Sequence, residues 1–144
     1  MVARIIAATI AGAIAIFIVG FVVYGLVLDP MVMRPNVIEY AGLMKDPPSW
    51  IPLVLANLVL AFLLSVIFDK WAGIKTFASG ASAGAIIVFL MTLYFDLSFF
   101  AFMHIFKNYI PMLADMAGGI VLGAVGGGVI GQVLGMMSKG SAAE

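Results

Sequence analysis

Long apolar runs alternate with short polar segments along this chain. Four of the runs are long enough to cross a lipid bilayer as helices, because about 20 residues suffice for a crossing. They cover residues 5–28, 50–68, 74–95 and 112–137. None of them alternates apolar and polar residues with a period of two, which argues against the strands of a membrane barrel. The pattern predicts an all-α integral membrane four-helix bundle that forms one domain over residues 1–144.

Polar residues and prolines mark the predicted helix ends. Asp29 and Pro30 close the first run, and a long connection follows over residues 29–49. A loop of that length in a compact protein is usually functional or folded over something. Ser49 stands directly before the second run, where its hydroxyl is suited to an N-cap. We therefore expect the second helix to begin at Trp50.

An aromatic segment, residues 97–110, separates the third and fourth runs and follows a charge, Asp96. If the third helix continued to Lys107 it would be about 50 Å long, well beyond a hydrocarbon core of about 30 Å. The helix then protrudes, or it breaks near Asp96 and the segment forms a short interfacial helix on the membrane surface. We favour the break.

Composition narrows the class of protein further. The 144 residues are 65% hydrophobic and 10% charged, whereas soluble domains have roughly 45–50% apolar and about 25% charged residues. A soluble catalytic domain is therefore excluded, and the lipid bilayer is the expected partner. Seven basic and seven acidic residues cancel, so no nucleic-acid partner is expected. Without cysteine there is no disulfide and no thiolate metal site, and no cofactor is predicted.

The distribution of basic residues predicts how the chain is oriented across the membrane. With the N-terminus in the cytoplasm, four basic residues lie on that side and three on the other: Arg4, Lys70, Lys75 and Lys139 against Arg34, Lys45 and Lys107. The cytoplasmic ones sit in short segments, where the positive-inside rule is most reliable. We therefore predict that both termini are cytoplasmic. Trp50 would then lie in the outer aromatic belt and Trp71 in the inner one.

The fourth run carries glycine at every fourth position: Gly119, Gly123, Gly127, Gly131 and Gly135. Small residues at this spacing let two helix backbones approach closely in a membrane. Complementary small residues stand in the first run at Gly12 and in the third at Gly84. The stripe serves either packing within one monomer, which we favour, or contact with a second copy or a larger membrane complex.

Ionisable residues gather near the predicted outer face: Asp96, His104, Lys107 and Asp115. Such groups at membrane depth are functional candidates by default. They could form a proton relay, a weak metal site or a cap on an aqueous pocket. The alternative, which we favour, is a set of interfacial residues at headgroup level. Their spacing does not predict a metal site, and no catalytic residues are assigned.

Two amides lie inside the runs, Asn57 in the second and Gln132 in the fourth. Amide side chains in membrane helices usually hydrogen-bond a neighbouring helix. We expect that role for both residues, in preference to contact with a substrate.

Short sequence elements also suggest a family. They are Phe21-Val22-Val23-Tyr24-Gly25, Gly42-Leu43-Met44, Phe77-Ala78-Ser79-Gly80 and the glycine-rich last run. With these the chain resembles an uncharacterised bacterial family of small four-span membrane proteins, known only as a domain of unknown function. The resemblance implies the four-span fold and the bacterial inner membrane, and nothing catalytic. The turn between Asp69 and Lys75 is shorter than the family pattern leads us to expect.

Three functions fit these observations. The first is a non-enzymatic accessory, scaffold or lipid-binding subunit that packs through the glycine-rich helix, as a homo-oligomer or within a larger membrane complex. The second is an oligomeric small transporter or channel, against which stands the lack of charge at the centre of every run. The third is a membrane-embedded enzyme or sensor with an outer-face site of Asp and His. We favour the first.

Overall fold

A computed structural model describes residues 2–140 and the side chains of residues 2–138. Every regular element in that part of the chain is helical, and four helical stretches are long and apolar enough to cross a membrane. The elements are α1 (Val2–Gly20), η1 (Phe21–Met33), α2 (Arg34–Asn36), α3 (Trp50–Val66), η2 (Ile67–Ala72), α4 (Phe77–Phe102) and α5 (Ile110–Gly140). The predicted all-α class is confirmed. The side chain of Lys139, which entered the orientation argument, lies outside the described part.

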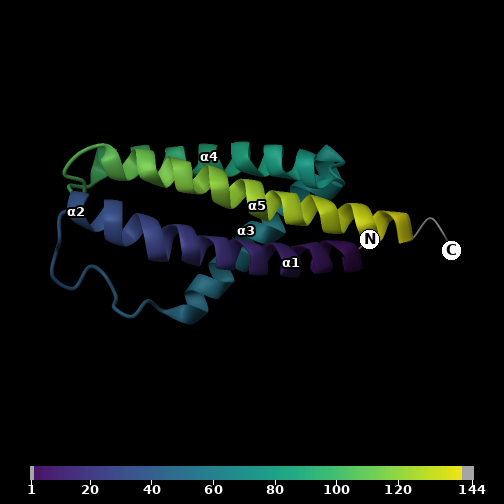
Figure 1. Ribbon diagram of the computed structural model, residues 1–144, viewed down its shortest axis with the longest axis horizontal. Coiled ribbons are helices and arrows are strands. Elements are labelled where there is room, and N and C mark those ends of the chain that lie inside the picture. The colour runs from purple at the N-terminus through teal and green to yellow at the C-terminus, as the bar shows by residue number, and fades with distance from the viewer. Residues whose placement is uncertain (1, 141–144) are drawn as a thin grey trace.

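The glycine-rich helix α5 lies at the centre of the arrangement. It packs against α4 on one side and α1 on the other, and α3 packs mainly against α1 (Figure 1). The start of α1 and the end of α5 lie at one end of the molecule, here called the terminal end (Figure 1). The opposite end, here called the loop end, holds α2 and residues 103–109. α3 is inclined to the other helices (Figure 1).

The first helical stretch does not end before Asp29, so that prediction is wrong. It continues through η1, a π-helix, and α2 to Asn36. Proline lacks an N–H and clashes with the carbonyl four residues earlier in an α-helix, but the wider π-helix accommodates Pro30. The Arg34 N–H donates to the Asp29 carbonyl, and the Arg34 side chain pairs with the Asp29 carboxylate at 2.8 Å. The connection is therefore only residues 37–49.

The predicted break near Asp96 is also wrong. α4 runs without interruption to Phe102, and residues 103–109 form a non-helical link. The helix continues because the Asp96 side chain is buried inside the bundle, so this charge marks no exit into water. No interfacial helix is present among residues 97–110, since this stretch consists of the end of α4, the link and the first residue of α5.

The turn between the second and third spans is tight, but it begins later in the chain than the end of the second apolar run at residue 68. Helical structure passes residue 68 and continues through η2 to Ala72, and Gly73 then adopts the left-handed conformation with φ +62°. α3 begins at Trp50 as predicted, although the Ser49 side chain makes no capping hydrogen bond. Thr76 does cap its helix, because its hydroxyl accepts a hydrogen bond from the Ser79 N–H at 3.2 Å.

The α4–α5 contact is made backbone to backbone. A Cβ atom added to Gly84 would meet the Gly123 carbonyl and lie 2.9 Å from the Gly127 Cα. Gly80 meets Gly127 and Gly131 in the same way. On another side of α5, Gly126 receives a side chain of α1, because a Cβ atom there would lie 2.5 Å from Ile16 Cγ1. The stripe is therefore filled from within the chain.

An ion pair joins the first and second spans at the terminal end. Arg4 Nε lies 2.7 Å from Asp69 Oδ1, and an Arg4 guanidinium N–H donates to Asp69 Oδ2 at 3.2 Å. The Asp69 side chain is fully buried. The pair lies beside an apolar core shared by α1, α3, η2 and α5, whose largest members are Ile16, Leu64, Phe68, Ile130 and Leu134.

Candidate functional site

Two of the ionisable residues singled out in the sequence meet near the loop end. Asp96 comes from the last third of α4, and Asp115 lies five residues after Ile110, the start of α5. Their carboxyl groups lie within side-chain hydrogen-bonding range of each other. A third group, the Tyr24 hydroxyl of η1, donates to the backbone carbonyl of Asp115 at 3.1 Å and lies within range of its carboxyl. We call these three residues the carboxyl cluster.

Glycines at the start of α5 make room for the carboxyl cluster. A Cβ atom at Gly118 would lie 2.8 Å from the Tyr24 hydroxyl and 2.8 Å from Leu28 Cδ1, so a larger residue would displace the Tyr24 ring. On the α4 side, a Cβ atom at Gly119 would lie 2.6 Å from Thr92 Oγ1. Two adjacent glycines therefore let polar side chains of η1 and α4 approach the same turn of α5.

Asp96 is the most enclosed member of the cluster, with 5% of its surface exposed. Its Oδ2 atom is buried and receives no hydrogen bond from any described donor. A carboxylate cannot donate, so two ionised carboxyl groups leave this oxygen unsatisfied. A buried acceptor without a partner is costly, typically by about 1–3 kcal/mol and more for a charged group. The buried Asp96 oxygen therefore lacks a hydrogen-bond donor as long as both carboxyl groups are ionised.

The other two members of the predicted set lie elsewhere. His104 and Lys107 are exposed in the link after α4. The His104 backbone carbonyl accepts a hydrogen bond from the Tyr40 hydroxyl, and Lys107 Nζ donates to the Pro35 carbonyl at 3.1 Å. Asp96 is separated from both of them, because α4 ends at Phe102, before His104 and Lys107.

These loop-end contacts tie two distant segments together. The Ile38 N–H donates to the Ile105 carbonyl at 2.8 Å, and the Lys107 N–H donates to the Asn36 carbonyl at 3.0 Å. The Asn108 amide donates to Asn36 Oδ1 at 2.8 Å. His104 and Lys107 therefore belong to a structural junction between the residues after α2 and the residues after α4.

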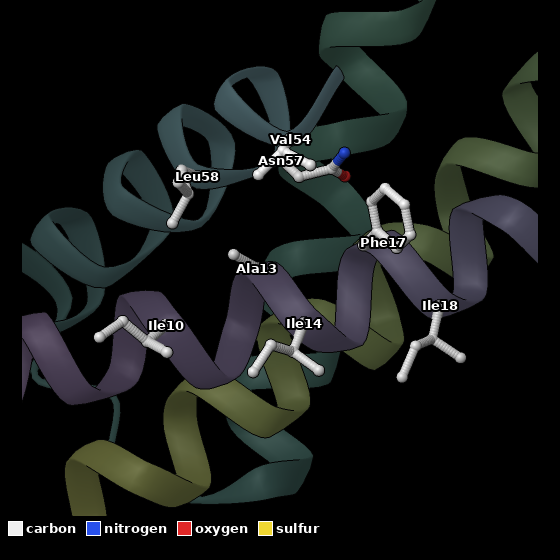
Figure 2. A pocket seen from close by; sticks show the side chains of 8 residues that line it. All are labelled: Ile10, Ala13, Ile14, Phe17, Ile18, Val54, Asn57 and Leu58. Carbon is white, nitrogen blue, oxygen red and sulfur yellow. The ribbon is translucent and has the colours of Figure 1, made fainter. Parts of the chain in front are cut away.

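The two amides do not bond a neighbouring helix, which corrects that expectation. Asn57 donates to the Leu53 carbonyl of its own helix at 2.7 Å. Its side chain lines an apolar cleft of about 220 Å³ between α1 and α3, together with residues that include Phe17 and Leu58 (Figure 2). Gln132 is exposed on the surface of α5. Both amides therefore face the surroundings of the chain.

Sequence reasoning missed two participants. Tyr24 appeared only within a family-like segment, and its hydroxyl turned out to contact α5. The Arg4–Asp69 pair was not predicted, although opposite charges at the same end of two spans were a usable signal. Among the residues that the structure describes, no group of three His, Cys, Asp or Glu side chains is placed to hold a metal ion.

No protein-family model, curated protein or solved structure matches the chain. The likeness to the uncharacterised four-span family thus stays a prediction.

Proposed function

We propose that this protein is a non-enzymatic accessory or scaffold subunit of a membrane assembly, and that its partner surface is the α1–α3 side of the bundle. The observation that carries the proposal is the uneven packing of α3. Its buried residues begin only at Ala61 and continue to Phe68. The half that starts at Trp50 is exposed and diverges from α1 at the cleft (Figure 2).

Asn57 lies in that unpacked half. An amide that faces lipid tails has no external hydrogen-bond partner, whereas an amide at a helix–helix contact contributes roughly 0.6–2 kcal/mol. A partner helix laid against the cleft would bury Val54 and Leu58 and would meet the free side of the Asn57 amide. This supports a helix from a second copy or from a larger membrane complex as the occupant.

The glycine stripe is occupied by packing within the chain, the role that the sequence analysis favours for it. Gly123, Gly127 and Gly131 meet the backbone of α4 in the same chain, so they are not free to bind a partner. Replacing Gly127 or Gly131 by leucine should disrupt the monomer itself. The partner contact is accordingly assigned to α3 and not to α5.

The proposal includes the membrane in which the chain lies and the side on which its termini lie. We place the chain in a bacterial inner membrane with both termini in the cytoplasm, supported by the family-like segments and by the basic residues at the terminal end. Membrane fractionation tests the first statement. Because the chain has no cysteine, single cysteines near Lys70 and in residues 37–49 can test the second with an impermeant thiol reagent. Labelling of the cysteine near Lys70 in intact cells would contradict the proposed orientation, because the reagent does not cross the membrane.

The decisive experiment is purification from native membranes in a mild detergent, followed by native mass spectrometry. We expect an oligomer or a co-purified membrane protein, and weaker association for Asn57→Leu. The matched control is Gln132→Leu, the same loss of an exposed amide on α5, which should leave association unchanged. A strictly monomeric particle that carries only lipid refutes the subunit role. Equal effects of the two variants refute the assignment to α3.

A further inference from the structure

The carboxyl cluster has a chemistry that the subunit role does not use. Two acidic side chains from different helices face each other inside the bundle, and one oxygen of Asp96 is buried without a donor. Two carboxylates within hydrogen-bonding range repel each other strongly in a medium of low dielectric constant. A proton or a cation between the two carboxyl groups would remove this repulsion.

The charged and titratable groups around Asp96 come from three elements. Asp115 faces it from α5, and Tyr24 of η1 reaches the same site through Asp115. The cations of the loop end have other partners: Lys107 Nζ donates to the Pro35 carbonyl, and Arg34 pairs with Asp29. The positive charge that the site requires is thus not supplied by these side chains.

We propose that Asp96 and Asp115 together bind one proton, and that this proton fastens α4 to α5 near the loop end. A proton on either carboxyl creates the O–H donor that the buried Asp96 oxygen lacks and removes one of the two facing charges. The hydrogen bond then formed between the two carboxyl groups is charge-assisted, and such bonds are short and strong.

Loss of the proton has a defined structural consequence. Two carboxylates would face each other across the α4–α5 contact, with a buried acceptor unsatisfied. The α4–α5 contact at Asp96 and Asp115 should then widen, because the two carboxylates repel each other across it. The glycine contact around Gly84 and Gly123 carries no charge, so it should stay closed. The inference is independent of the proposed subunit role and survives its failure.

A direct measurement of the proton is available by infrared difference spectroscopy on protein in lipid nanodiscs. We expect a protonated-carboxyl band that disappears as the pH is raised. Asp96→Asn and Asp115→Asn should each remove it. Asp29→Asn is the matched control, since Asp29 is paired with Arg34 at the surface, and should leave the band unchanged. A band that persists in both cluster variants, or no band in the wild type, overturns the proposal.

The opening is measured between spin labels. The chain has no cysteine, so a pair at Leu97 and Leu113, both exposed, reports on the loop end without background. We expect a longer and broader distance distribution at alkaline pH. A control pair at Ser82 and Val121 lies at the glycine contact and should not change.

Asp96→Asn separates the proton from other causes. Its amide N–H donates to Asp115 at every pH, so the Leu97–Leu113 distance should stay short. A pH-dependent distance in this variant, or a constant distance in the wild type, overturns the proposal. Sodium chloride that restores the short distance at alkaline pH, where choline chloride does not, would also overturn it by showing a metal-cation site.

Discussion

Replacing Gly84 by alanine tests whether the α4–α5 contact depends on backbone approach. The new Cβ would lie 2.9 Å from the Gly127 Cα and 3.1 Å from the Gly123 carbonyl carbon, and closer still to the Gly123 oxygen. All three are backbone atoms, so no side-chain rotation relieves the overlap. Because unstrained carbon contacts lie at about 3.5–4.0 Å, α5 has to retreat from α4 by roughly 0.5–1 Å.

The cost follows from three terms. Overpacking of a tight contact costs up to about 3 kcal/mol. Lost Cα–H···O contacts between the two helices add about 0.5–1 kcal/mol each. The helix propensity of alanine over glycine offsets about 1 kcal/mol. We expect Gly84→Ala to lower the free energy of unfolding by about 3 kcal/mol, since the steric term dominates.

Gly25→Ala is the matched control. A Cβ atom at Gly25 would lie 3.5 Å from Phe21 Cδ2 in its own helical segment, which is ordinary contact. This variant should be neutral or more stable by up to about 1 kcal/mol. The assay is an unfolding titration with a denaturing detergent in mixed micelles, followed by circular dichroism. If the free energies of unfolding of Gly84→Ala and Gly25→Ala agreed within about 0.5 kcal/mol, the usual error of such comparisons, the close-approach reasoning would be refuted.

Three further substitutions test other contacts. Arg4→Ala leaves the buried Asp69 carboxylate without its partner and should lower the free energy of unfolding by about 3 kcal/mol in the same titration. An Arg4→Met/Asp69→Leu double variant removes both charges and should lower it by less. Equal losses in the two variants would contradict the ion-pair argument. Asn36→Ala removes the bond to Asn108 and should speed amide hydrogen exchange at the loop-end junction, at a cost of about 1 kcal/mol; unchanged exchange there would show that the backbone bonds suffice. His104→Ala should leave stability within about 0.5 kcal/mol, as expected for an exposed side chain; a larger change would assign this imidazole a role.

The helical spans could be predicted from the sequence because a long, uniformly apolar run satisfies its backbone hydrogen bonds in a bilayer by forming a helix. Their ends could not be predicted equally well. Asp29 and Asp96 each resemble a helix terminus in the sequence, yet both lie inside helical segments. Asp29 is neutralised by Arg34 five residues later, and Asp96 faces a residue of another helix. A charged residue marks a helix end only when water solvates it. A single sequence does not show whether its partner lies instead on another helix.

The candidate site was predictable in the same partial way. Asp115 stands one turn before Gly119, which places it on the packed side of its helix, and its carboxyl faces Asp96. Tyr24 had no comparable signal, because its role depends on which helix lies beside α5. His104 and Lys107 follow Asp96 closely in the sequence, but α4 ends at Phe102, so both lie in the link and away from the carboxyl groups.

The inclination and short reach of α3 determine where the bilayer ends. Residues 37–49 run beside the bundle from the loop end to the start of α3, and the first turns of α5 lie beyond that start (Figure 1). Non-helical backbone is not tolerated in contact with lipid tails, so the water–hydrocarbon boundary has to fall near Trp50. Trp71 closes the same span about 30 Å away, at 1.5 Å per residue, which matches the thickness of a hydrocarbon core.

The last turns of η1 and α4 and the first turns of α5 consequently stand in the headgroup layer. The Asp96–Asp115 pair, near the end of α4 and in the second turn of α5, then lies at the depth where lipid headgroups meet water. Protons can reach it from the aqueous phase without crossing any hydrocarbon.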